Sequence, residues 1–209
     1  MEIKREKIRT LERKYRLNLI NSISGIKPGN LIATKSKDGK ENVAIFSSVV
    51  HIGSDPAELG FIIRPQGETP RDTYANIYNT EYYTINHIPE SLIKKAHYTS
   101  AKLPIGESEF DRMKIEKEYL DDFYAPFVKE SPVKIGMKFI SGVPLHNGCT
   151  FMIGSVESIY VPDTAINELG QLNLSDYNGV GIGGLNSYYS LNKIDSFPYV
   201  RLNEIPDFE

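Results

Sequence analysis

Short apolar segments separated by turn residues crowd the first third of the chain, and this spacing limits the fold more than any other feature. Leu31–Lys35, Glu41–His51 and Glu58–Arg64 are short and rich in apolar or β-branched residues, which is typical of strands. Asp38-Gly39 and Asp55-Pro56 separate them, and Asp-Gly supplies the positive φ angles of a tight hairpin. Because no helix fits between these strands, the sequence favours antiparallel pairing and a barrel or sandwich.

Beyond residue 64 the patterns alternate between helix and strand. Residues 89–97 place Leu92, Ile93 and Ala96 on one side and predict a helix. A basic segment at 2–16 predicts a solvated helix laced with opposite charges, and residues 107–119 predict a charged, partly helical excursion. Gly181–Gly184 lacks the Lys-Ser/Thr of a phosphate loop and is interpreted as a strand turn. Further strands are predicted at Glu81–Asn86, Val133–Ser141 and Thr150–Val161.

Composition excludes several classes of protein. The chain has 209 residues and a formal net charge of −3, which gives no reason to expect nucleic acid. Its single cysteine, Cys149, allows no disulfide within the chain and points to a reducing compartment. The four histidines are scattered without metal-ligand spacing, so no metal site is expected. No apolar run could cross a membrane, and the basic N-terminus contains acids and lacks an apolar core, so we expect a cytoplasmic protein.

The strongest candidate binding feature is a predicted helix start at residues 69–73. Thr69 suits the N-cap, Pro70 suits the first helical position, and Asp72 lies in the first turn. A helix N-terminus presents unpaired N–H groups, and here Arg71 and the hydroxyls of Thr69 and Thr73 crowd the same turn. This pattern predicts a phosphate cradle, with an ordinary capped helix and a solvated arginine as the alternative.

Two hydroxyls, those of Ser47 and Ser48, interrupt an otherwise apolar strand and need hydrogen-bond partners once buried. They either bond back to the main chain or face a flat polar ligand whose phosphate lies on the predicted helix. Protein nucleophiles find little support, because Cys149 has only His146 nearby in the sequence. The carboxylates of the excursion are expected to be solvated. These observations favour chemistry carried by a cofactor.

The composite of these segments resembles the flavin reductase-like family, from about Pro28 to about Tyr199. The motifs are Asn-x-Ala-x-Phe-Ser-Ser ending at Ser48, a turn with Asp55-Pro56, a strand ending in Arg64-Pro65, and Arg-Asp-Thr-x-x-Asn-Ile ending at Ile77. The resemblance implies a mainly β protein with an antiparallel, Greek-key split β-barrel, a few peripheral helices and bound FMN. It implies one domain over residues 1–209, with a helical extension at 1–20 and a charged excursion at 103–125.

The resemblance also implies which residues meet the flavin. Residues 47–49 match the strand that meets the isoalloxazine ring. Arg64, Arg71 and Thr73 match positions near the phosphate. Asn76 lies one helical turn after Thr73, on the same face. The 100–102 segment matches one that closes over the cofactor, and Tyr188 belongs either at the pocket rim or in the core. Ile26–Asn30 replaces the Arg-Pro common in the family, which leaves the entrance to the site and the hydride donor open. The implied set is Ser47, Ser48, Val49, Arg64, Arg71, Thr73, Asn76, Ser100, Lys102 and Tyr188.

The function implied by the resemblance is an FMN-dependent oxidoreductase that receives electrons from NAD(P)H or a protein donor. Two alternatives remain open at this point: a reductase that treats flavin as a diffusible substrate, and a non-catalytic FMN-binding electron carrier or sensor. A homodimer with sites shared between two chains is expected, because family sites lie where two barrels meet. Tyr82, Tyr83, Phe139 and Phe151 are interpreted as offering more strand surface than one barrel needs, available in part to a second copy and in part belonging to the core.

Overall fold

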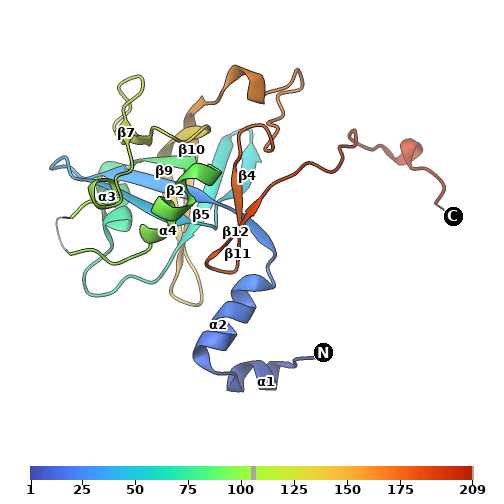
Figure 1. Ribbon diagram of the computed structural model, residues 1–209, viewed down its shortest axis with the longest axis horizontal. Coiled ribbons are helices and arrows are strands. Elements are labelled where there is room, and N and C mark those ends of the chain that lie inside the picture. Colours follow the sequence, from blue (N-terminus) through green and yellow to red (C-terminus); the bar gives the residue numbers. More distant parts are fainter. Residues whose placement is uncertain (105–106, 209) are drawn as a thin grey trace.

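The computed structural model describes residues 1–104 and 107–208, so residues 105 and 106 of the predicted excursion lie outside it. Seven strands form one antiparallel sheet, in the order β3-β2-β6-β9-β10-β5-β4. Figure 1 shows the strands of this sheet crossing one another at the centre of the protein. The chain is therefore mainly β, as the close spacing of its apolar segments predicts. The strands are β2 (Asn30–Lys35), β3 (Glu41–Phe46), β4 (Val50–Ser54), β5 (Ala57–Ile63), β6 (Tyr82–His87), β9 (Lys134–Pro144) and β10 (Thr150–Tyr160).

Two smaller sheets and several short helices complete the described part. β1 (Ile26–Pro28), β11 (Val180–Gly183) and β12 (Ser187–Ser190) form a three-stranded sheet in the order β1-β11-β12, and β7 (Lys117–Glu118) pairs with β8 (Phe127–Val128). In the described residues no helix has the length and apolar character needed to span a bilayer. The helices are α1 (Arg5–Thr10), α2 (Arg13–Ser22), α3 (Asp72–Thr80), α4 (Ile93–Tyr98) and α5 (Glu109–Arg112), with 3-10 turns η1 (Glu90–Leu92), η2 (Asp163–Ala165) and η3 (Leu202–Glu204).

The core lies on both faces of β2, which explains why this strand is apolar throughout. Successive side chains of a strand point to opposite faces. Ile32 packs with Phe61 and Met152 inside the curved sheet, whereas Leu31 and Ala33 pack with a second cluster that includes residues of α4 and α5. The helices α3, α4 and α5 all contact β3. The helices near the candidate site therefore pack on strands β2 and β3.

Four predicted elements differ from the structure. The strand predicted over 41–51 is two strands, because the chain bends at residues 47–49 between β3 and β4. The predicted N-terminal helix is broken at Leu11, and Glu12 caps the second half by accepting from the N–H groups of Lys14 and Tyr15. The excursion is not fully solvated, because Glu109 and Phe110 of α5 are buried. The predicted N-cap at Thr69 is also wrong: Arg71 occupies that position and α3 begins at Asp72.

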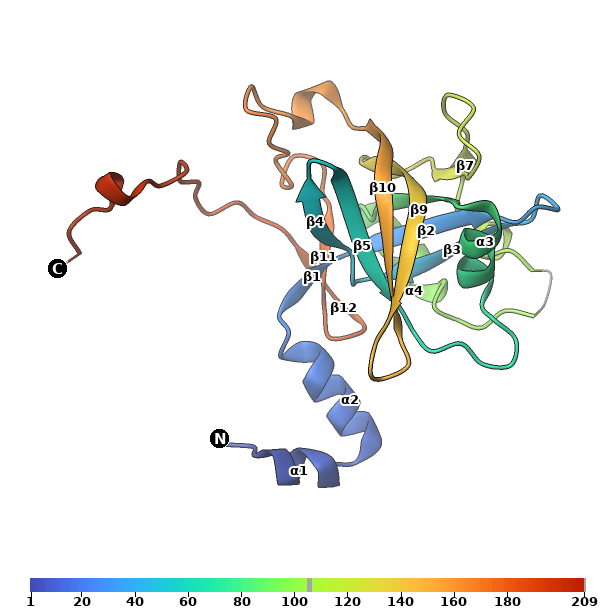
Figure 2. The same cartoon turned by 180° about the vertical axis from the view of Figure 1, so that it is seen from behind.

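Both ends of the described chain project from the body, as Figures 1 and 2 show. Helices α1 and α2 have no buried residue. Residues 191–208, which we call the C-terminal arm, follow β12 and run outward in extended form apart from η3. Helix α2 leads into β1, and β1 and β12 both pair with β11. The two projecting segments therefore leave from the same small sheet.

Candidate functional site

Helix α3 begins without a side-chain cap, and this uncapped end is the centre of the candidate site. Arg71 occupies the N-cap position with extended backbone angles, and its side chain makes no capping hydrogen bond. The N–H groups of the first turn of a helix have no partner within the helix, so an uncapped end offers donors to an anion. Arg71 itself is exposed beside them. The arrangement has the chemistry of an anion site.

Gln66 shapes the loop that brings two arginines to this end of α3. Its side-chain carbonyl accepts from the backbone N–H of Arg71 at 2.9 Å, and its amide nitrogen donates to the backbone carbonyl of Arg64 at 2.6 Å. Both arginines are exposed, so their guanidinium groups are free to meet a solvent-borne anion. Gln66 was not predicted as a site residue, and nothing in the sequence distinguishes it from an ordinary polar loop residue.

Two buried hydrogen bonds fix α3 on the sheet. The hydroxyl of Thr73 donates to the side-chain carbonyl of Asn42 at 2.8 Å, and the amide of Asn76 donates to the hydroxyl of Thr34 at 3.0 Å. All four residues are buried. Thr73 and Asn76 thus share one helix face, as predicted, and that face points to β2 and β3. Their side chains hold the helix in place under its exposed N-terminal end.

Asn42 extends this network to the excursion. Its amide donates to a carboxylate oxygen of Glu109 on α5. Burial raises the pKa of Glu109 above its ordinary value, and the nearby carboxylate of Asp72 acts in the same direction. One asparagine therefore joins α3, β3 and α5. A buried polar residue in an apolar strand needs partners, so the reasoning applied to Ser47 and Ser48 would also have found Asn42.

The bend between β3 and β4 contains the serines that the sequence places at the ring. The hydroxyl of Ser48 accepts from the backbone N–H of Ile62 at 3.0 Å and donates to its carbonyl at 3.3 Å. Through a side chain, this pair of bonds continues the β4–β5 pairing two residues beyond the Val50–Gly60 pair. Val49 packs against the core cluster that contains Phe61. The bend is therefore fixed to the same strand, β5, whose end carries Arg64.

The other predicted residues gather at the end of α4. The hydroxyl of Tyr188 on β12 lies 3.0 Å from Nδ1 of His97, and burial raises the pKa of Tyr188. Ser100 donates to the backbone carbonyl of His97 at 2.8 Å, and Lys102 is exposed two residues later. His97 was not predicted, because a lone histidine in a helix carries no sequence signal. Tyr188 also packs against a core cluster, which is one of its two predicted roles, and its place at a pocket rim stays a prediction.

The ten predicted residues thus form two groups. Ser47, Ser48, Val49, Arg64, Arg71, Thr73 and Asn76 surround the β3–β4 bend and the start of α3, whereas Ser100, Lys102 and Tyr188 surround the end of α4. No hydrogen bond described in the structure joins the two groups. Across residues 1–104 and 107–208, no cluster of three or more His, Cys, Asp or Glu side chains is placed to hold a metal ion.

The sequence and the structure both match known proteins. Residues 26–180 match the family described as the flavin reductase like domain, so Tyr188 and both projecting segments lie outside the match. A crystal structure from Shewanella frigidimarina, described as a candidate flavin reductase with a split barrel domain, is 43% identical. That match has a TM-score of 0.92 and covers 96% of this chain and 100% of the other.

Two more distant structures bear on the fold. Nitrilotriacetate monooxygenase component B from Bacillus cereus is 19% identical, with a TM-score of 0.82 over 94% of this chain and 98% of its own. Flavoredoxin of Desulfovibrio vulgaris is 18% identical, with a TM-score of 0.71 over 84% of this chain and 92% of its own. The split barrel predicted from the sequence is thereby confirmed.

Proposed function

Because the chain belongs to the flavin reductase-like family, which indicates oxidoreductase activity, we propose that it is an FMN-dependent enzyme that takes electrons from NAD(P)H or a protein donor. The observation that carries the FMN assignment is the uncapped start of α3, which directly follows the loop that Gln66 bridges from Arg64 to Arg71. Bound flavin supplies the electron transfer, and the described residues bind and orient it.

The residues present fit a phosphate monoester. Its oxygens are hydrogen-bond acceptors, and the start of α3 offers donors to them: backbone N–H groups and the guanidinium of Arg71, whose positive charge offsets the carboxylate of Asp72 in the same turn. A single phosphate matches a single helix end, which favours FMN over a flavin with a second phosphate and a nucleotide. Arg64 lies at the other end of the same loop, where it adds a second cation to the phosphate side.

Hydrogen counting separates the residues that touch the ligand from those that position them. A hydroxyl has one hydrogen, and Thr73 donates its own to Asn42, so only the backbone N–H of Thr73 is left to bind phosphate. Ser48 likewise donates to the carbonyl of Ile62. This leaves the hydroxyl of Ser47 and the backbone of residues 47–49 as the groups that we assign to contact with the ring. Asn76 donates to Thr34 and acts as a positioning residue.

A homodimer is part of this proposal, and its support comes from an exposed apolar face. Val50 pairs with Gly60 and Ile62 pairs with Phe151, which in turn pairs with Val143, so these side chains share the outer face of adjacent strands. Val50, Ile62 and Val143 are 40–48% exposed. A two-fold axis through such a face buries the same patch on both chains.

The surface residues expected from the sequence do not make this face. Tyr83 is fully buried, Tyr82 packs on Phe123 and Tyr124, and Phe139 packs on Tyr78, so these aromatic rings belong to the chain's own packing. Only Phe151 lies on the outer face, where it is half-buried.

The test compares FMN with riboflavin, which lacks the phosphate. We expect Arg71→Ala to weaken FMN by about 10- to 150-fold, the range of about 1.5–3 kcal/mol for a charged hydrogen bond, and to leave riboflavin unchanged. Flavin fluorescence titration gives both affinities. Arg112→Ala, which removes an exposed arginine from α5, is the matched control and should change neither. Equal losses for both ligands would assign Arg71 a structural role.

The same preparation separates enzyme from carrier. The FMN-loaded protein should oxidise NADH or NADPH under steady-state conditions, and the added acceptor should set the rate. Bound FMN that neither nicotinamide nor a protein donor reduces would instead identify an electron carrier or sensor.

A further inference from the structure

The C-terminal arm carries large apolar side chains that its own chain leaves uncovered. Phe197 is 79% exposed, Tyr199 is 90% exposed and Phe208 is 84% exposed. Leu202 is 89% exposed and Ile194 is 99% exposed. Isolated apolar residues on a surface are ordinary, whereas many large exposed apolar residues on one short segment point to an interaction site.

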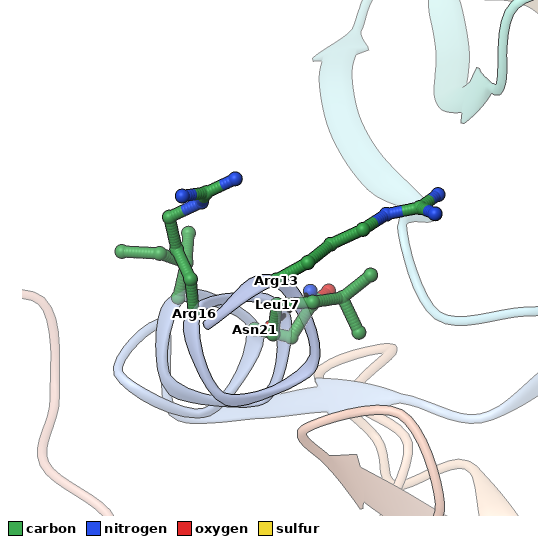
Figure 3. Close-up of a pocket in the computed structure, with 5 residues that line it drawn as sticks. Arg13, Arg16, Leu17 and Asn21 are labelled. Carbon is green, nitrogen blue, oxygen red and sulfur yellow. Dashed lines mark hydrogen bonds between the residues drawn. The ribbon is translucent and has the colours of Figure 1, made fainter. Parts of the chain in front are cut away.

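Helix α2 presents exposed apolar and basic side chains that could receive such an arm. An open hollow lies along the helix and is lined by Arg13, Arg16, Leu17, Ile20 and Asn21. Figure 3 shows Arg13 and Leu17 on the same side of the helix. Leu17 is 41% exposed and Ile20 is 43% exposed. Arg16 donates to the backbone carbonyls of Arg9 and Leu11, which joins α1 to α2. Arg13 remains exposed, with no partner described in the structure.

We propose that the arm of one chain lies along α2 of a second copy, and that the second copy's arm does the same in return. The inference rests on the homodimer of the proposed function. Figures 1 and 2 show the arm running away from the body, so its apolar residues do not reach the faces of their own chain. Because α2 and the arm leave from opposite edges of the sheet β1-β11-β12, the two arms of a two-fold dimer can be exchanged so that each lies along the partner's α2.

The charges of the two segments support a contact between the arm and α2. Residues 1–22 carry seven lysines or arginines and three glutamates. The described arm carries three acids and two bases, and its last seven residues carry Glu204 and Asp207 with no base. Opposite charges across a contact favour the correct partner and suppress others.

The area is also of the right size. Phe and Tyr side chains bury roughly 150–250 Å² each, so three that are mostly exposed offer on the order of 400–600 Å² per arm. Two reciprocal arms then approach the roughly 1,600 Å² total of a standard stable interface once Leu202, Ile205 and α2 are added. The arm also has a counterpart elsewhere: the Shewanella structure leaves 4% of this chain uncovered, about eight residues, fewer than the arm contains.

The first test is the dimer dissociation constant of the full chain, measured by sedimentation at several concentrations. Phe197→Ser with Leu202→Ser should raise it at least tenfold. Because both side chains are exposed in a single chain, the substitutions remove no packing within it, and a folding defect is not expected. Unchanged dimerisation would overturn the proposal.

The second test asks whether the arm binds to α2 of the partner. Arg13→Glu with Lys14→Glu should weaken the dimer at low salt, as should Asp195→Lys with Asp207→Lys, and combining all four should restore it. Lys37→Glu with Arg112→Glu changes the charge equally and should have no effect. A dimer that depends on Phe197 but not on Arg13 and Lys14 would overturn the contact with α2. FMN titration of each variant is a separate readout, so failed flavin binding tests the proposed function and leaves the dimer measurement intact.

Discussion

Replacing Thr73 by valine separates anchoring of α3 from contact with the flavin. Valine has nearly the shape of threonine but no hydroxyl. In the structure that hydroxyl donates to Asn42 at 2.8 Å, where Thr73 is 6% and Asn42 is 7% exposed. The substitution leaves the side-chain carbonyl of Asn42 buried without this donor. The cost of such an unsatisfied group is about 1–3 kcal/mol, and we expect the free energy of unfolding to fall by that amount.

The prediction for FMN is the opposite, because the single hydrogen of the hydroxyl is already used. FMN affinity of Thr73→Val should therefore fall by less than about threefold, since backbone N–H groups remain and the lost hydroxyl is directed at Asn42. Urea unfolding gives the stability and fluorescence titration gives the affinity, both on the same preparation. Thr73→Ser, which keeps the hydroxyl, should retain the hydrogen bond and lose only a methyl contact. Unchanged stability together with a tenfold or larger loss of FMN affinity would refute the reasoning.

Two further predictions concern pH. Burial lowers the pKa of His87 to about 4, so the unfolded chain binds a proton before the folded chain does as pH falls below about 6.5. The free energy of unfolding should therefore drop by up to about 2 kcal/mol between pH 8 and pH 5. His87→Gln should remove this pH dependence, and a flat profile for the wild-type protein would contradict the prediction. Glu109 should give the opposite pH dependence. Burial raises its pKa above the ordinary 4.5, so the folded chain holds the proton more tightly than the unfolded chain does. The free energy of unfolding should therefore fall as pH rises above 4.5. Glu109→Gln keeps an acceptor for Asn42 and should flatten this decline in urea unfolding at pH 4 to 8; a steeper decline would show that the carboxylate is stabilising when charged.

Local patterns in the sequence were enough to predict the strands. β2, β5, β6, β9 and β10 lie within a few residues of their predicted positions, because each is a short apolar run bounded by turn residues. The same reasoning failed where a side chain outside the expected motif decides the local structure. The N-cap of α3 is Arg71 and not Thr69, and Gln66, which precedes the predicted motif, accepts from the N–H of Arg71.

The sequence by itself determined the fold class and the family, because each depends on composition and spacing within a segment. Only the tertiary structure decided what each polar side chain does. Thr73 is 31 residues from Asn42, and Asn42 is 67 residues from Glu109. A hydroxyl or amide can bind a ligand or a neighbouring residue, and local sequence does not reveal which partner lies within 3 Å. The pairing of the strands and the packing of α3 and α5 on β3 bring those partners together.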